Sequence, residues 1–147
     1  DIAVRYYRRL ELVDNFDNLD DTILKFALNI PDEKVPQMQA FLDEKLGHML
    51  TAVTTGHGSI DLIIPGVHKA NGLRILQQRW GIENHEVVAF GDSGNDIEML
   101  QHAGFGFAMA NAAAPVKAVA GFDAPHNNEE GVLHIIDKVL NREAPFA

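Results

Sequence analysis

The stretch VVAFGDSGND, residues 87–96, organises the rest of this sequence. It opens with a run of apolar, partly β-branched residues, a pattern typical of a buried strand. The run stops at Gly91, and a helical pattern begins at Asp96. The carboxylates of Asp92 and Asp96 therefore follow the carboxyl end of a strand, which is where ligands bind in open α/β sheets. The stretch predicts a strand, a tight loop and a helix that together form a site.

The residue types in this loop indicate a magnesium site. Asp92, Asn95 and Asp96 offer hard oxygen ligands, which Mg²⁺ prefers and which waters and a substrate phosphate usually complete. The amino end of the following helix favours a nearby anion. The alternative is a solvated turn in which Asn95 or Asp96 caps the helix, and for a single residue that is the simpler interpretation. The whole group of residues favours the metal site.

Three further stretches accompany this loop: PGVHKANG at 65–72, FGFAMANA at 105–112 and NNEEGV at 127–132. Together with GDSGND, they resemble the haloacid dehalogenase superfamily of phosphotransferases, in its Cof-like sugar-phosphatase branch. GDSGND is similar to the fourth motif of that superfamily, and Lys69 is similar to the lysine of its third motif. The four motifs occur in the family's order, and the resemblance covers the chain from about Asp21 onward.

The resemblance implies an α/β fold with a partial parallel, Rossmann-like core and a small β-α-β-β portion of an inserted α/β cap domain. Residues 1–65 would be the C-terminal portion of the cap, which selects the substrate. Residues 66–147 would be the C-terminal half of the phosphatase core. The alternation of strand and helix patterns after residue 87 independently indicates a parallel sheet with crossover helices.

Local patterns place the individual elements. Strands are predicted at 23–30, 49–55, 59–64, 87–90, 105–109 and 121–125, and helices after 32, 69, 96, 111 and 131. Asp32 and Asn111 are predicted caps of the helices that follow them. The apolar stripe of the last helix, from Val132 to Leu140, is predicted to be core. Four cap positions, Thr54, Thr55, His57 and Ser59, are candidates for facing the substrate, with hairpin-turn roles as the alternative.

Lys69 stands in the first turn of its predicted helix. The helix dipole disfavours a cation there, so an ammonium at this position indicates a phosphate or carboxylate partner. A solvated surface lysine is the alternative if Lys69 is considered alone. Asn71, two residues further on, would cap the helix or contact the site.

The chemistry that the resemblance implies is Mg²⁺-dependent hydrolysis of a phosphate monoester through an aspartyl-phosphate, with sugar phosphates as the implied substrates. Lys69, Asp92 and Asp96 would be the catalytic residues. Asp92 would bind Mg²⁺ directly, and Asp96 would hold a metal-bound water or the loop. Asn95 would contact the phosphate or the substrate, and Lys69 would neutralise the nucleophile and the phosphoryl oxygens.

The sequence departs from the family at the first motif, an Asp-x-Asp followed two residues later by Thr. The acidic cluster that ends at Thr22 has no such spacing, and no apolar strand precedes it. We therefore expect the nucleophile, the general acid and the second motif to lie in a missing N-terminal half of the same protein. The strand at 87–90 would pair with a strand of that half, which leaves an apolar edge unpaired here.

The composition of the chain limits the binding partners that are expected for it. The formal charge is −9, from 12 basic and 21 acidic residues, which argues against nucleic acid as a partner. A phosphorylated small molecule stays compatible, because a bound Mg²⁺ inverts the local charge. The absence of cysteine excludes disulfide and thiol chemistry. The sequence shows neither a membrane-span pattern nor a signal peptide, so the expected location is the cytoplasm.

Three hypotheses about function stay open at this point. The first is a sugar phosphatase represented by its C-terminal part. The second is a non-catalytic module that binds Mg²⁺ and pairs with a partner through its open edge. The third is a related phosphotransferase such as a phosphomutase. The sequence does not specify the substrate.

Overall fold

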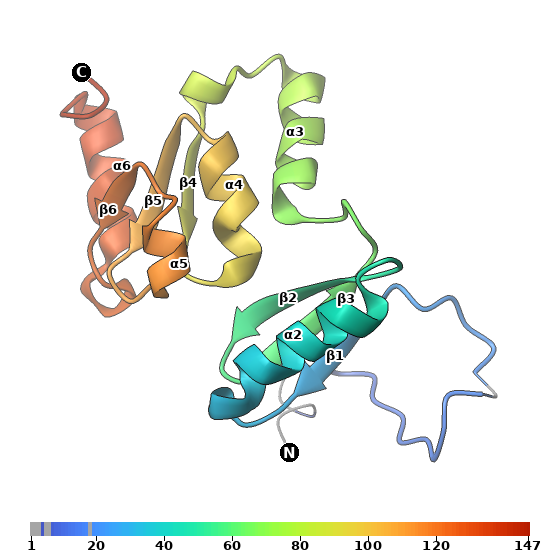
Figure 1. Cartoon of the computed structure of the whole chain (residues 1–147). Helices are drawn as coiled ribbons and strands as arrows, with labels where there is room; N and C mark the ends of the chain where they lie inside the picture. The colour runs from blue at the N-terminus through green and yellow to red at the C-terminus, as the bar shows by residue number, and fades with distance from the viewer. Residues whose placement is uncertain (1–3, 5–6, 18) are drawn as a thin grey trace.

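The computed structural model describes residues 4, 7–17 and 19–147 and contains two separate three-stranded sheets (Figure 1). The first sheet is antiparallel with strand order β1-β3-β2, and the second is parallel with order β4-β5-β6. The α/β class with a partial parallel core is thus confirmed. The last strand of the first sheet ends at residue 63 and the next helix begins at residue 69. The division into cap and core at residue 65 stays a prediction.

The antiparallel unit consists of β1 (Lys25–Asn29), α2 (Val35–Leu46), β2 (Thr51–Gly56) and β3 (Ser59–Ile63). It has the predicted β-α-β-β order. Side chains alternate across a strand, so one face of the sheet packs against α2 while the other faces away from it. The buried core of this unit consists of Leu42, Ala52, Ile60 and Leu62.

The prediction that Asp32 caps α2 is wrong. A short 3₁₀ turn, η1 (Asp32–Lys34), precedes the helix, and Lys34 occupies the N-cap position without a side-chain hydrogen bond. The Lys34 N–H donates to the carbonyl of Pro31 at 2.9 Å. The chain therefore turns before the helix begins, and Asp32 lies inside that turn.

The parallel unit follows the connection at residues 64–68. Its elements in order are α3 (Lys69–Trp80), η2 (Asn84–Glu86), β4 (Val88–Gly91), η3 (Gly94–Asp96), α4 (Ile97–His102), β5 (Phe105–Met109), α5 (Ala114–Lys117), β6 (Phe122–Ala124), η4 (Asn127–Glu129) and α6 (Gly131–Asn141). Gly81 ends α3 in the left-handed conformation, with φ +69°, a common helix terminus that glycine adopts without strain.

Apolar strand residues form the core of the parallel unit. Phe107 on β5 is 2% exposed and stacks with Phe90 and Phe122, at ring-centroid distances of 5.6 and 5.1 Å. These three phenylalanines come from three adjacent strands, so their packing fixes the sheet at its centre. The helices α4 and α6 pack against strands of this sheet (Figure 1). Because β4, β5 and β6 are parallel, their carboxyl ends lie at one edge of the sheet, beside the loop at 92–96.

The edge at β4 and parts of α3 and α6 are not covered by the described residues. β4 pairs with β5 and with no other described strand, so it forms an edge of the sheet. Ile75 and Trp80 on α3 are 62% and 63% exposed. The prediction that the apolar stripe of α6 is core holds for Ile135, but Leu140 is 74% exposed. The stripe is exposed because no described segment packs against that part of α6.

No helix in the described part of the chain has the length and apolarity needed to cross a membrane.

Candidate active site

The loop after β4 folds around the carboxylate of Asp96. Asp96 Oδ2 accepts hydrogen bonds from the N–H groups of Asp92 and Ser93, at 2.9 and 3.2 Å. Asp96 is only 4% exposed, and buried carboxylates require such partners. A Cβ at Gly91 would overlap the Asp96 side chain. Glycine at 91 therefore allows the carboxylate to lie against the end of β4.

The other oxygen of this carboxylate binds Lys69. The Lys69 ammonium, at the start of α3, donates to Asp96 Oδ1 and forms an ion pair with it. The lysine side chain is 49% exposed while that of Asp96 is 5% exposed. The pair offsets the unfavourable position of a cation at a helix amino end. About half of the lysine side chain is left exposed beside the pair.

Asp92 is hydrogen-bonded to Asn111, a residue that was predicted from the sequence to cap a helix. Asn111 Nδ2 donates to Asp92 Oδ2 at 3.3 Å, and Asn111 Oδ1 accepts the N–H of Asn127 at 3.1 Å. The prediction that Asn111 caps α5 is wrong, because Ala113 occupies that N-cap position. Asn111 follows β5, the neighbour of β4, and the ends of parallel neighbours share one edge. The position of Asn111 directly after this predicted strand could therefore have identified it as a site residue from the sequence.

Asn95 and Lys69 line the same cavity, of about 180 Å³. The wall of this cavity includes both units of the chain, with Val53, Asp61, Ile63, Val67, His68, Lys69, Asn95 and Glu98 as its lining residues. The site residues predicted from sequence are thus brought together at one place. Lys69 binds Asp96, Asp92 shares the loop, and Asn95 faces the adjoining cavity.

The antiparallel unit touches the loop directly. A Cβ at Gly94 would overlap Thr54 Oγ1, and one at Gly56 would lie 3.2 Å from Ser93 Oγ. Of the four candidate cap positions, Thr54 therefore lies against the site loop. His57 lies in the β2–β3 turn with φ +51°, which agrees with the hairpin-turn alternative.

The acidic residues fit Mg²⁺ to different degrees. Asp92 Oδ1 has no hydrogen-bond partner among the described residues, so it is open to a cation. Both oxygens of Asp96 are already engaged, by Lys69 and by the loop. The described residues contain no group of three His, Cys, Asp or Glu side chains that could hold a metal. Mg²⁺ usually needs one or two carboxylates plus waters and phosphate oxygens, so Asp92 fits a direct ligand and Asp96 fits a residue that holds the loop.

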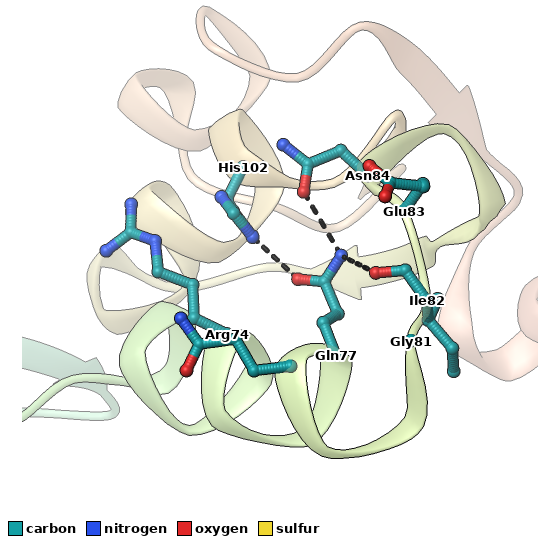
Figure 2. Close-up of a pocket in the computed structure, with 8 residues that line it drawn as sticks. Arg74, Gln77, Gly81, Ile82, Glu83, Asn84 and His102 are labelled. Carbon is teal, nitrogen blue, oxygen red and sulfur yellow. Dashed lines mark hydrogen bonds between the residues drawn. The ribbon is translucent and has the colours of Figure 1, made fainter.

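A second, larger cavity of about 370 Å³ lies between α3, η2 and α4 (Figure 2). At its centre Gln77, 6% exposed, donates to the Ile82 carbonyl and to Asn84 Oδ1. Gln77 Oε1 accepts a hydrogen bond from His102 Nε2 at 2.7 Å. Figure 2 shows these side chains converging on the Gln77 amide. The network joins α3 to α4, the two helices that flank the Lys69–Asp96 pair.

Comparison with known proteins shows which family the chain belongs to. The family described as haloacid dehalogenase-like hydrolase matches residues 4–136.

The chain belongs to the haloacid dehalogenase-like hydrolase family.

Named relatives agree with this membership. The chain is 63% identical over 145 residues to the 5-amino-6-(5-phospho-D-ribitylamino)uracil phosphatase YbjI of Escherichia coli strain K12. The aligned region covers 99% of this chain and 54% of that relative. The crystal structure of SMU.1108c from Streptococcus mutans UA159 superposes with a TM-score of 0.87 at 40% identity, over 95% of this chain and 53% of that one. The predicted resemblance is therefore confirmed.

A third similarity is to the solved structure of the subclass IIB sugar phosphatase BT4131 of the same superfamily. Its TM-score is 0.66 at 25% identity, over 80% of this chain and 44% of that one. The chain spans about half the length of the proteins it matches.

Proposed function

We propose that this chain is the C-terminal part of a Mg²⁺-dependent phosphatase that hydrolyses phosphate monoesters, with sugar phosphates as the substrate class. The observation that carries the proposal is the ion pair of Lys69 with Asp96, beside Asp92 at the carboxyl end of β4. The names of two similar proteins support the reaction: one is a phosphatase of a 5-phospho-D-ribitylamino compound, and the other is a sugar phosphatase.

Each residue of the site has a proposed role that matches its contacts. The Lys69 ammonium would neutralise phosphoryl oxygens, and Asp96 would hold that ammonium and the loop in place. Asn95, on the cavity wall, would contact the phosphate or the rest of the substrate. Mg²⁺ bound at Asp92 would neutralise charge on the transferring group and orient the attack.

We place the nucleophile in the length of the relatives that this chain does not cover. There, a carboxylate would attack phosphorus and form an aspartyl-phosphate, which divides one difficult displacement into two easier ones. The unpaired edge of β4 and the exposed apolar residues Ile75 and Trp80 on α3 support a further segment packed against this part of the unit. A cytoplasmic location, and the exclusion of nucleic acid and membrane as partners, stay predictions from the sequence.

The proposal is tested by phosphate release from p-nitrophenyl phosphate and a panel of hexose phosphates, with Mg²⁺ or with a chelator. The protein used is this chain extended to the full length of its relatives. We expect release that requires Mg²⁺. A phosphomutase would instead transfer the phosphoryl group to a second sugar, and a non-catalytic module would bind Mg²⁺ without turnover. Either result would overturn the proposal.

A further inference from the structure

The cavity beside Lys69 also contains a carboxylate that the proposed reaction does not use. Ile60 and Leu62 on β3 are buried in the core with α2. Because side chains alternate along a strand, Asp61 between them lies on the opposite face. Asp61 lines the cavity together with Val53, Ile63 and Lys69. A molecule with its phosphate at Lys69 would therefore place its remaining atoms near Asp61.

Asp61 is held by one neighbour and keeps an open acceptor. Lys25 on β1 donates to Asp61 Oδ2 at 2.7 Å, and the Asp61 side chain is 15% exposed. This hydrogen bond to Asp61 raises the pKa of Lys25 above its usual value of 10.5. Asp61 Oδ1 has no partner among the described residues. An ionised carboxylate has about four acceptor positions and no donor, so Asp61 has capacity left for a ligand that donates.

We propose that Asp61 is a specificity-determining residue that accepts a hydrogen bond from a hydroxyl or N–H group of the substrate's leaving group. The inference rests on the proposed function and adds a selection rule to it: phosphates of polyhydroxylated molecules are preferred to phosphates without such donors. The flanking Val53 and Ile63 are apolar, and in a mostly apolar pocket a few polar groups set orientation and specificity. A ligand without a donor leaves Oδ1 of the carboxylate desolvated and without a hydrogen bond.

The test compares two substrates in the full-length protein. Asp61→Ala should lower kcat/KM for hexose phosphates by about 10- to 100-fold, the range expected for a hydrogen bond to a charged group. The same variant should change kcat/KM for p-nitrophenyl phosphate, whose leaving group has no donor in the ester, by less than about 3-fold. An equal loss on both substrates would indicate a structural role and overturn the proposal.

Two further variants distinguish loss of the Asp61 hydrogen bond from a folding defect. Asp61→Asn keeps the shape and one acceptor oxygen, and should lie between the unaltered protein and Asp61→Ala in its preference for hexose phosphates. Lys25→Met is the matched control, because it removes the ion-pair partner but keeps the carboxylate. It should retain most of the preference. A Lys25→Met variant that loses the preference as fully as Asp61→Ala would contradict the assignment to Asp61.

A binding measurement separates this inference from the proposed function. If the unaltered protein releases no phosphate from any ester, the proposed function fails, and calorimetry with glucose 6-phosphate and with inorganic phosphate then tests Asp61 directly. Asp61→Ala should weaken binding of glucose 6-phosphate and leave binding of inorganic phosphate unchanged. Equal weakening of both ligands, or binding of neither, would overturn the inference.

Discussion

Lys69 donates to Asp96 Oδ1 across 27 positions of the sequence, so the first turn of α3 is tied to the loop after β4. The second oxygen of the same carboxylate accepts two N–H groups of that loop. One nearly buried side chain therefore positions both a cation and the backbone around Asp92.

Lys69→Met should lower kcat/KM of the full-length protein by at least about 100-fold, because it removes a preorganised cation from the phosphoryl position. It should also lower the free energy of unfolding by about 1–3 kcal/mol, because Asp96 loses one partner of a buried carboxylate. Steady-state phosphate release and urea unfolding measure the two effects. Lys69→Arg is the control: it should restore stability but not full activity, since a guanidinium has a different shape. Activity of Lys69→Met within 3-fold of the unaltered protein would contradict the assignment.

Gly91→Ala should lower the free energy of unfolding by about 1–3 kcal/mol, as expected when atoms are inserted into a packed site. The new Cβ would overlap the Asp96 side chain and displace it from the loop. Gly72→Ala is the matched control, because a Cβ at that α3 position meets no atom within 4 Å. It should stabilise the chain by about 0.5–1 kcal/mol, since alanine is the better helix former. Equal unfolding midpoints for the two variants would show that Gly91 is not required.

Asn111→Ala should weaken the apparent affinity of the full-length protein for Mg²⁺ by about 10-fold, the lower end of the effect of removing a hydrogen bond to a metal ligand. The reason is that Asn111 Nδ2 orients the Asp92 carboxylate. The affinity is read from the Mg²⁺ dependence of phosphate release. Asn127→Ala is the control, because Asn127 reaches this network through its backbone N–H. A shift in Mg²⁺ dependence caused by Asn127→Ala but not by Asn111→Ala would be inconsistent with this geometry.

His102 should make the chain less stable in mild acid. Burial, with a smaller contribution from Arg74, lowers the pKa of His102 from its usual 6.5. The unfolded chain then binds the proton more tightly than the folded chain, so stability falls as the pH drops below 6.5 until the folded imidazole is itself protonated. The effect is small, because the ring is only partly buried. Thermal unfolding between pH 5 and 7.5 should show a flatter profile for His102→Gln than for the unaltered chain, and equal slopes for the two proteins would contradict this role of His102.

The strands and most helices could be predicted from the sequence because apolar runs and punctuating glycines indicate them locally. β4 lies within one residue of its predicted range, and α3 begins at Lys69 as predicted. The predictions of helix caps failed for a physical reason: Asp and Asn form caps, turns and side-chain contacts with similar ease. Asn111 was therefore assigned to α5, although it lies against Asp92.

The partners within the site required the tertiary structure. The position of Lys69 in a helix's first turn indicated an anionic partner, but nothing local identified Asp96 among the acidic residues. The exposure of the α6 stripe was also beyond sequence patterns. Periodicity shows which face of a helix is apolar, but it does not show whether the described chain supplies a surface to cover that face.

The role of Asp92 and the need for the rest of the protein are tested by phosphate release from hexose phosphates with three proteins in Mg²⁺: this 147-residue chain, the full-length protein, and its Asp92→Ala variant. We expect that the full-length protein turns over, that Asp92→Ala lowers its rate by at least about 100-fold, and that the 147-residue chain alone is inert. Release by the 147-residue chain at a rate comparable to the full-length protein would show that another carboxylate of this chain acts as the nucleophile, and the proposed function would then be wrong.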